Sequence, residues 1–416
     1  MNLKKEISII NIGSNTICVA IAKEDRKEGT ELIESSKIRI VGVGYQLAKG
    51  IKRGSITNLS ELEESILGTI AIAEGEAQKS IKSVLVALPS WALSFGVADS
   101  SISVGQLPVD DIHISSLMNF DTSKYVDFDT EVIHMFPVSY SIDDVGNIAD
   151  PIGMVGSKLS STYHIIAAKS TVIKNITNCL NRNNIEISGF ISSTYASALS
   201  VLLDEEISSG VTLIDVGGST TSIACMYDGA LLHLGCIPVG SQHITNDIAT
   251  VLRTTKSNAE RLKILYGATV GPSAEESVLV SRVDEYGDEH VQNISKGMLD
   301  SIISARLDEI LNLVQDYIRE SGADKTLYQR IVITGGGSRL SGLNEFIKSK
   351  KHFGDLSIRL GKPMGVVGSH DFVKAASFAS VAGGAMYCLG NFVNKGAFEE
   401  RKTLWQKVVT WIKRGI

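Results

Sequence analysis

The same strand–turn–strand pattern occurs twice in the chain, once near its start and once near its middle. In the first copy an apolar run contains Asn11 and leads into a turn over residues 13–16; in the second, an apolar run contains Asp215 and leads into a turn over residues 217–220. Glycine and small polar residues make up both turns, so backbone N–H groups can approach an anion closely. A matched pair of such turns predicts two duplicated halves that grip a polyphosphate between them.

A third glycine cluster follows a third apolar run. Residues 331–334 predict a buried strand, and Gly335–Ser338 lead from it into a predicted helix near Leu343–Phe346. Taken alone, the cluster is equally well explained as a tight strand-to-helix connection. The order of two phosphate turns followed by a strand with three glycines is similar to that of the superfamily of actins, heat-shock ATPases and sugar kinases. The similarity implies a duplicated two-lobe α/β fold, actin-like and ribonuclease H-like, with the third cluster against the adenosine.

Within this superfamily the chain resembles the FtsA family of bacterial cell-division proteins over nearly its whole length. Segments that match family segments in the same order are Gly42–Gly44, Lys49–Ile56, Ser83–Leu88, Val132–His134, Asp150–Gly153 and Glu309–Val314. The resemblance implies subdomain 1A at 1–83 and 160–200, an inserted subdomain 1C at 84–159, subdomain 2A at 201–235 and 306–390, and subdomain 2B at 236–305. A linker over 391–402 and an amphipathic helix over 403–416 complete the expected organisation.

Composition fits a globular protein with more than one core. A chain of 416 residues with 44% hydrophobic and 21% charged residues is too long for one comfortable core and too apolar for disorder. The net charge of −6, without a basic stripe, gives no reason to expect nucleic acid as a partner. The five scattered cysteines predict buried thiols in a reducing compartment. No apolar leader opens the chain, and the uncharged stretch 375–394 is too rich in glycine and polar residues for a membrane span, so we expect a buried helix there.

Local patterns predict several elements. Asn58 is placed to cap a helix whose apolar face carries Leu62, Ile66 and Ile70, and Ser170–Asn181 predicts a second helix. Ser257 and Glu260 have the spacing of a capping box. Two histidines, His134 and His164, stand among apolar strand residues, which favours core imidazoles with satisfied hydrogen bonds over metal ligands.

The resemblance implies ATP and Mg²⁺ as ligands, with Asp215 and Asn11 holding the metal through water. The nucleotide-binding residues that it implies come from both turns, from a helix of subdomain 2B and from the third glycine cluster: Gly13, Ser14, Asn15, Thr16, Asp215, Gly217, Gly218, Ser219, Thr220, Glu260, Lys263, Gly335, Gly336, Gly337 and Ser338. For Glu260 and Lys263 it implies contacts with the ribose and adenine, whereas the local pattern alone indicates a helix start.

Two positions depart from the family pattern. Asn11 stands where relatives have an acidic residue, and an amide oxygen accepts from a metal-bound water without adding negative charge. Thr16 stands where FtsA relatives commonly have lysine, so a direct phosphate contact is lost. Together the departures predict nucleotide binding with slow turnover, and we name no catalytic residue. A turn that has simply been rebuilt is the alternative.

The C-terminal residues form an amphipathic pattern. On a helical wheel of about 100° per residue, one arc is apolar and the opposite arc is polar or cationic. The apolar arc contains Leu404, Trp405, Val408, Val409, Trp411, Ile412 and Ile416, and the polar arc contains Gln406, Lys407, Thr410, Lys413 and Arg414. Tryptophans opposite cations are typical of a helix that lies in the membrane interface. A helix packed against the body of the protein is the alternative.

The resemblance therefore implies an adaptor of cell division. Such a protein polymerises on the cytoplasmic face of the inner membrane, at the septum, binds anionic lipids as a peripheral protein, and captures the C-terminal tail of the tubulin-like FtsZ. Lys296 and Arg306 match basic family positions on subdomain 2B where that tail docks, although a solvated helix face explains them equally well. Later division proteins are further implied partners. The alternatives are a PilM-like protein of type IV pilus assembly and a small-substrate kinase of the same fold.

Overall fold

The computed structural model describes residues 6–25, 37–52, 55–269, 276–283, 289–320, 330–368 and 371–389. The predicted linker over 391–402 and the predicted amphipathic helix over 403–416 lie outside these ranges. Every helix in the described part of the chain is too short or too polar to span a lipid bilayer.

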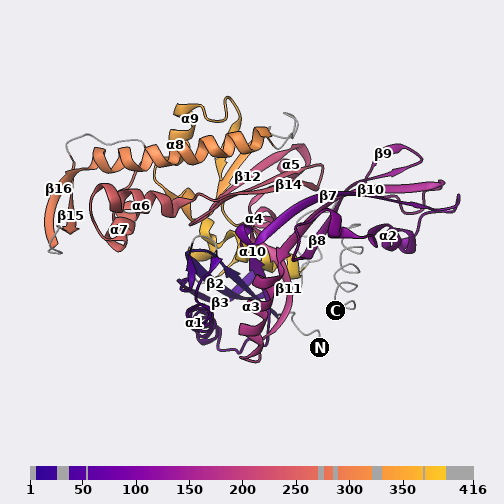
Figure 1. The fold of residues 1–416 in the computed structure, drawn as a ribbon, viewed down its shortest axis with the longest axis horizontal. Coiled ribbons are helices and arrows are strands. Elements are labelled where there is room, and N and C mark those ends of the chain that lie inside the picture. Colours follow the sequence, from indigo (N-terminus) through magenta and orange to yellow (C-terminus); the bar gives the residue numbers. More distant parts are fainter. Residues whose placement is uncertain are drawn as a thin grey trace.

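Two sheets form the centre of the molecule (Figure 1), and five strands of the first correspond in order to the five strands of the second. The first has the order β11-β6-β1-β2-β3-β19 and the second the order β14-β13-β12-β17-β18. The strands of the first are β1 (Glu6–Ile12), β2 (Thr16–Asp25), β3 (Lys37–Leu47), β6 (Ser83–Leu88), β11 (Glu186–Ser192) and β19 (Val366–Val367). Those of the second are β12 (Val211–Val216), β13 (Thr221–Tyr227), β14 (Ala230–Ile237), β17 (Arg330–Thr334) and β18 (Ser357–Leu360).

The pairing within the two sheets confirms the predicted duplication. In each half the hairpin strands, β1–β2 and β12–β13, are antiparallel, and a third strand extends each hairpin antiparallel. On the other side of each hairpin two strands run parallel, β6 and β11 in one half and β17 and β18 in the other. We call the two halves lobe I and lobe II. A small hairpin of β4 (Ile51–Lys52) and β5 (Ser55–Ile56) also belongs to lobe I.

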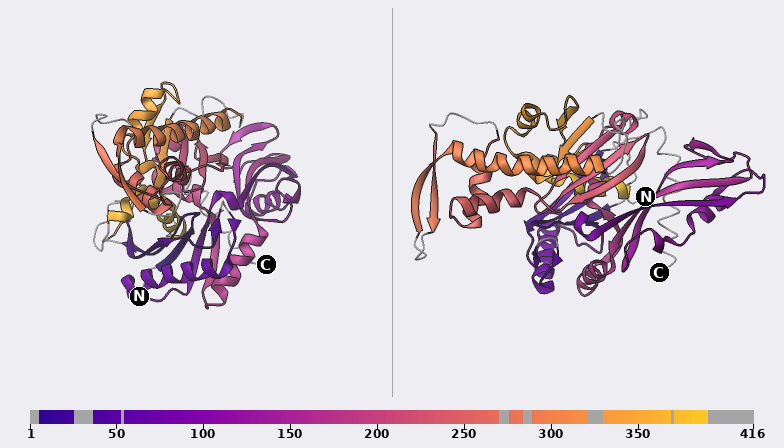
Figure 2. Two further views of the ribbon diagram at one scale, coloured as in Figure 1. Left: turned by 60° about the vertical axis from the view of Figure 1, so that its left-hand side comes forward. Right: turned by 45° about the horizontal axis from the view of Figure 1, so that its top comes forward.

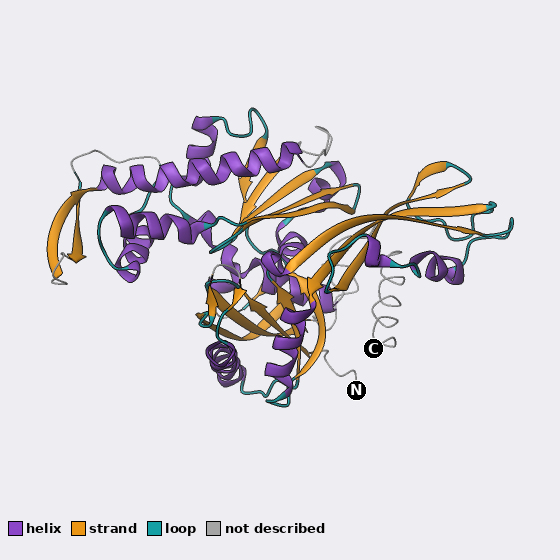
Figure 3. Cartoon of the chain, in the orientation of Figure 1, coloured by secondary structure: helices purple, strands orange, loops and turns teal. Residues whose placement is uncertain are grey.

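Helices cover the sheet of lobe I (Figure 3). They are α1 (Leu59–Ala77), α3 (Ser170–Asn181), α4 (Ser193–Val201) and the C-terminal α10 (Ala379–Leu389), and the short α5 (Asp204–Ser209) leads into lobe II. As predicted, α3 has the bounds 170–181, and the Asn58 side chain accepts from the backbone N–H of Ser60 and Glu61 to begin α1. The helix expected within 375–394 begins only at Ala379. Its Gly383 lies against α4, where a Cβ atom would clash with the carbonyl oxygen of Ala196.

A four-stranded sheet extends from lobe I to one end of the molecule, on the right in Figure 1. Its order is β7 (Leu93–Ser103), β10 (Lys158–Lys169), β8 (Thr130–Ile142) and β9 (Val145–Ile148), with α2 (Asp111–Met118) packed against it. This sheet differs from the limits expected for subdomain 1C, 84–159. The expected start falls inside β6, which belongs to the sheet of lobe I, and β10 continues to Lys169 because it pairs with β7 and β8 along its whole length.

A second extension occupies the opposite end of the molecule, as the right-hand view of Figure 2 also shows. It consists of α6 (Ser241–Val251), α7 (Lys256–Tyr266), β15 (Ser277–Val283), β16 (Glu289–Ser295) and the first half of α8 (Lys296–Glu320). The long α8 contributes Leu299 and Ile303 to this extension and Leu307 and Leu311 to the core of lobe II, where α9 (Leu343–Lys350) also packs. One continuous helix therefore joins the two cores.

The capping box predicted at Ser257 and Glu260 is wrong. The N-cap of α7 is Thr255, whose hydroxyl accepts from the backbone N–H of Asn258 at 3.2 Å. Glu260 does not reach back to the helix start, because its carboxylate pairs with Lys263 on the next turn of α7.

Two buried histidines lie on neighbouring strands of the four-stranded sheet. His134 packs against the rings of Phe136 and Tyr195, and His164 stacks on Phe95. Both are core residues as predicted, but they are not satisfied: Nε2 of His134 and both ring nitrogens of His164 have no hydrogen-bond partner among the described residues. Burial lowers the pKa of His134 to about 3 and the pKa of His164 to about 4.

These pKa values predict an acid-sensitive fold. Because the folded-state pKa values lie below the ordinary value, the stability is fully present above about pH 6.5 and is lost as the pH falls toward the folded values, by up to about 2 kcal/mol per histidine at pH 5. Replacing His134 and His164 together by phenylalanine should flatten the pH dependence of the unfolding free energy between pH 7 and pH 5, measured by denaturant titration. His290→Gln, at an exposed position of β16, is the control. A double variant as acid-sensitive as the unaltered protein would contradict this origin of the effect.

Candidate functional site

The two hairpin turns are closed in the same way. In the first turn the Gly13 N–H donates to the Thr16 carbonyl at 3.0 Å, and in the second the Gly217 N–H donates to the Thr220 carbonyl at 2.9 Å. A Cβ atom would lie 2.8 Å from the Thr16 carbonyl oxygen if added at Gly13, and 2.9 Å from the Thr220 carbonyl oxygen if added at Gly217. Each turn therefore needs glycine at this position for a steric reason, which explains the repeated sequence pattern.

The tips of the two turns face each other across the lobes. A Cβ atom at Gly218 would lie 2.9 Å from the Cβ of Asn15, so the lack of a side chain at Gly218 permits the approach. The Gln242 side chain, at the start of α6, donates from Nε2 to Oδ1 of Asn15 at 3.3 Å. The first backbone N–H groups of α6, on Ser241 and Gln242, donate to the carbonyls of Gly217 and Gly218. Lobe II thus meets the first turn through both its own turn and helix α6.

The side chain of Asp215, near the end of β12, is contacted from two sides, by Ser197 and by Gly335. The Ser197 hydroxyl, on α4, donates to its Oδ2 at 2.7 Å. On the other side lies Gly335, where a Cβ atom would clash with Oδ1 of Asp215, so the third glycine cluster packs directly against this carboxyl. Burial raises the pKa of Asp215 to about 6, and the hydrogen bond from Ser197 acts against the increase. The rotamer of the carboxyl is therefore fixed before any ligand binds.

Two further polar atoms, in or next to the turns, are buried without a hydrogen-bond partner among the described residues. They are Oδ1 of Asn11, which occupies in β1 the place that Asp215 has in β12, and the hydroxyl of Ser219; neither has a hydrogen-bond partner within the described ranges. An unpartnered amide oxygen suits a metal-bound water, and an unpartnered hydroxyl suits a phosphate oxygen. No group of three or more His, Cys, Asp and Glu side chains gathers as a metal site in the described part of the chain. The donors fit a hydrated Mg²⁺ held by Asp215 and Asn11 better than a metal bound by protein ligands alone.

Glu260 and Lys263 lie beside this region and bind each other at 2.8 Å. Lys263 is buried, with 8% of the residue exposed, and its ammonium also donates to the Thr245 hydroxyl at 2.8 Å and to the Ser241 carbonyl at 3.3 Å. These bonds use the donors of Lys263 to hold α7 against the start of α6. The predicted contacts of both residues with ribose and adenine remain predictions.

Tyr45, on β3, lies beside the first turn. Its hydroxyl hydrogen-bonds with the hydroxyl of Thr16, and Glu260 and Arg339 are near enough to affect its pKa, which burial raises. Four residues at the site were not singled out from the sequence: Tyr45, Ser197, Gln242 and Arg339. Each lies outside the glycine clusters, so the glycine pattern gave no signal for it.

The remaining residues of the third cluster also have structural roles. The backbone at Gly335 has a positive φ of 86°, Ser338 donates to the carbonyl of Gly335 at 2.8 Å, and Gly337 packs against Val216. Gly336 is exposed and has nothing within 4 Å of a Cβ position, so the structure shows no steric reason for glycine there.

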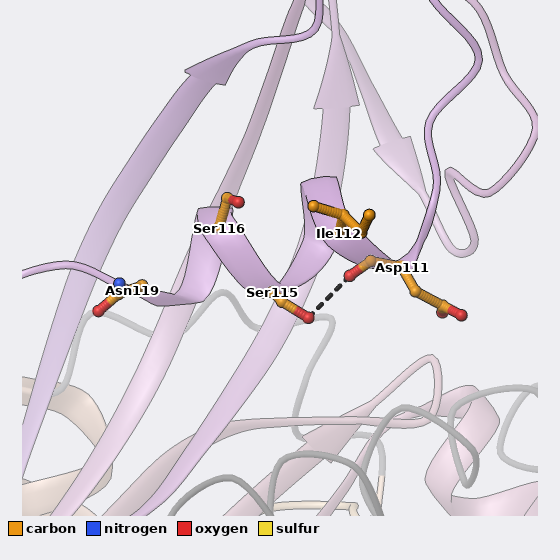
Figure 4. Close-up of a pocket in the computed structure, with 5 residues that line it drawn as sticks. All are labelled: Asp111, Ile112, Ser115, Ser116 and Asn119. Carbon is orange, nitrogen blue, oxygen red and sulfur yellow. Dashed lines mark hydrogen bonds between the residues drawn. The ribbon is translucent and has the colours of Figure 1, made fainter. Parts of the chain in front are cut away.

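The two cations predicted to meet a partner peptide lie away from the turns, on α8. Lys296 pairs with Glu276 at 3.3 Å, and Arg306 makes two hydrogen bonds to Asp247 of α6, at 2.5 and 2.9 Å. Neither is an isolated cation. An open hollow at α2 is lined by Asp111, Ile112, Ser115, Ser116 and Asn119 (Figure 4).

Solved structures share this architecture. The PilM–PilN type IV pilus biogenesis complex matches with a TM-score of 0.62 at 13% identity, over 92% of this chain and 99% of that chain. MreB5 of Spiroplasma citri bound to ADP matches with a TM-score of 0.54 at 13% identity, over 94% and 99%. At this identity the likeness concerns the fold. The duplicated sheets and the two facing turns define a protein of the actin-like class.

Comparison of the sequence with known families and proteins shows to which family of the actin-like class the chain belongs. The profile described as cell division protein FtsA matches residues 212–383, and the profile described as the SHS2 domain inserted in FtsA matches residues 94–167, which is the four-stranded sheet. Cell division protein FtsA of Neisseria meningitidis is 31% identical over 99% of this chain and 98% of its own, and that of Agrobacterium fabrum is 30% identical over 92% and 86%. The chain belongs to the FtsA family of cell division proteins.

The two turns should contribute unequally to metal–nucleotide binding. If Asp215 and Asn11 hold the metal as the family resemblance implies, Asp215→Ala removes a pre-positioned carboxyl and should weaken Mg²⁺–ATP binding by roughly 10- to 100-fold, whereas Asn11→Ala removes a neutral acceptor and should weaken it about five-fold. Titration calorimetry with Mg²⁺ and with EDTA measures both effects. The reverse ranking would show that the roles of the two turns are assigned incorrectly.

Proposed function

We propose that this protein is an adaptor of cell division that binds ATP between its lobes, polymerises on the cytoplasmic face of the inner membrane and holds the FtsZ ring there. The observation that carries the proposal is the alignment with cell division protein FtsA over almost the whole chain, at 31% identity with the Neisseria meningitidis protein. The same observation favours this function over pilus assembly, because the likeness to the PilM–PilN complex stands at 13% identity and concerns the fold.

The two facing turns support ATP as the ligand that this protein binds. Two glycine turns face each other; Oδ1 of Asn11, in the strand before the first turn, and the hydroxyl of Ser219, in the second turn, have no hydrogen-bond partner among the described residues. When bound, Mg²⁺ would neutralise part of the phosphate charge, with Asp215 and Asn11 holding it through water. The turn residues 13–16 and 217–220 would position the phosphates from either side, and residues 335–338 would lie against the adenosine. Because Asn11 and Thr16 are uncharged, the first turn lacks the charges that support rapid phosphoryl transfer. Binding of ATP, rather than its hydrolysis, would then support the function.

Restoring the two charges tests this account of the first turn. Asn11→Asp with Thr16→Lys should raise Mg²⁺–ATP affinity by roughly ten-fold, because each charge faces a ligand already held by the opposite turn. The unaltered protein should bind ATP with very slow phosphate release. Affinity is measured by calorimetry and release by a phosphate assay, with each single substitution as a control. Brisk phosphate release by the unaltered protein would contradict a weakened first turn.

The C-terminal pattern supports membrane attachment in the proposal. Lys402, Lys407, Lys413 and Arg414 would contribute about 1 kcal/mol each on an anionic leaflet, and the apolar arc several more, less the cost of ordering the helix. One copy would therefore bind reversibly. Linked copies raise the effective concentration of their neighbours, so a polymer would hold the membrane firmly.

A charge on the apolar arc should release the protein from membranes. Trp411→Glu places a carboxylate in the middle of that arc, at a cost of several kcal/mol for insertion. In liposome flotation with anionic vesicles, the variant should stay at the bottom of the gradient while the unaltered protein floats. Thr410→Glu, on the polar arc, is the matched control and should still float at least in part. Flotation of the Trp411 variant equal to that of the unaltered protein would show that this segment is not the anchor.

Lys296, in subdomain 2B, and Arg306, directly after its expected last residue, support capture of the FtsZ tail at this subdomain. Since Glu276 and Asp247 already bind these cations, an acidic tail would have to compete with them, which favours a moderate and reversible affinity. The later division proteins that the adaptor would recruit belong to the same proposal.

A further inference from the structure

Gln242 lies between the two lobes, at the tips of both turns. It is the second residue of α6, and its backbone N–H donates to the Gly218 carbonyl at 2.8 Å. From this anchored backbone its side chain crosses to lobe I and donates to Oδ1 of Asn15 at 3.3 Å. The carboxamide therefore spans the tips of the two turns.

A polyphosphate that enters between the turns must meet this carboxamide. The tips already approach closely, since a Cβ atom at Gly218 would be 2.9 Å from the Cβ of Asn15. An anion placed between the tips has to part them or take the place of one member of the Asn15–Gln242 bond. A carboxamide has two donor hydrogens, and the bond to Asn15 uses one of them.

The neighbouring donors are already occupied within the protein. The backbone N–H groups of Ser241, Gln242 and His243 donate to the carbonyls of Gly217, Gly218 and Gly240, so the start of α6 offers no free amide in its first three residues. The nearby ammonium of Lys263 is bound to Ser241, Thr245 and Glu260. With these donors occupied, the Gln242 side chain is a donor that α6 can offer to an anion at the turn tips.

We propose that Gln242 recognises the terminal phosphate of a nucleoside triphosphate, exchanging its neutral partner Asn15 for a phosphate oxygen. The inference rests on the proposed binding of ATP between the lobes. A charge-assisted hydrogen bond is about twice as strong as a neutral one, so the exchange favours the triphosphate. A diphosphate, which lacks the terminal group, leaves the Asn15–Gln242 bond in place. Gln242 thereby makes the protein prefer ATP over ADP.

The test compares ATP and ADP affinities, by calorimetry with Mg²⁺, for three full-length variants. Gln242→Ala should lower ATP affinity by about ten-fold and leave ADP affinity nearly unchanged. Gln242→Glu keeps the length and shape of the side chain but cannot donate and carries a like charge, so it should lower ATP affinity more than alanine does. A side chain needed only for packing would show the opposite order. Thr250→Ala is the control, because the Thr250 hydroxyl, on the same helix, donates to the carbonyl of Asn246; both affinities should stay unchanged.

The outcomes separate this inference from the proposed function. If the unaltered protein binds ATP and the ratio of ATP to ADP affinity is unchanged in the alanine and glutamate variants, Gln242 does not contact the terminal phosphate. An equal loss for both nucleotides, or a loss also in the Thr250 control, would overturn the assignment in the same way. If the unaltered protein binds neither nucleotide, the proposed ATP site itself fails.

Discussion

The contact between the tips of two hairpin turns is the constraint on which the rest of the structure depends. Each turn is closed by one hydrogen bond from a glycine N–H, and the absence of a side chain at Gly218 lets the second turn approach Asn15. Because the turns belong to different lobes, this approach determines how the two sheets face each other. The buried polar atoms of Asn11 and Ser219, and the carboxyl of Asp215 that Ser197 holds, lie in or next to these two turns.

Helices connect the two turns with more distant parts of the molecule. Helix α6 contacts the first turn through Gln242, its second residue, and further along binds Arg306 of α8 through Asp247. Helix α8 in turn packs with both the extension and the core of lobe II. Helix α6 therefore connects the two turns with the surface that carries Arg306, the proposed site of partner capture. On the other side, Ser197 links Asp215 to α4, which α10 contacts closely at Gly383.

Much of the fold could be predicted from the sequence because its signals are local. Repeated glycine turns indicated the duplication, and apolar periodicity with Asn58 as the cap indicated α1. The capping box at Ser257 failed because Thr255, two residues earlier, is an equally good hydroxyl cap, and local spacing cannot choose between them. Of the candidate site, only the residues of the glycine turns could be predicted from the sequence. Gln242 and Asn15 are 227 residues apart in the chain, so only the fold brings the two side chains together. The acidic partners of Lys296 and Arg306 were missed for the same reason.

The central claim is that the two turns hold a nucleotide between them, and a crystal structure of the protein with Mg²⁺ and a non-hydrolysable ATP analogue tests it most directly. The account predicts polyphosphate density between residues 13–16 and 217–220, a hydrated metal beside Asp215 and Asn11, and the base against residues 335–338. Nucleotide bound elsewhere on the protein, with the Asn15–Gln242 bond intact and the turns still in contact, would contradict it.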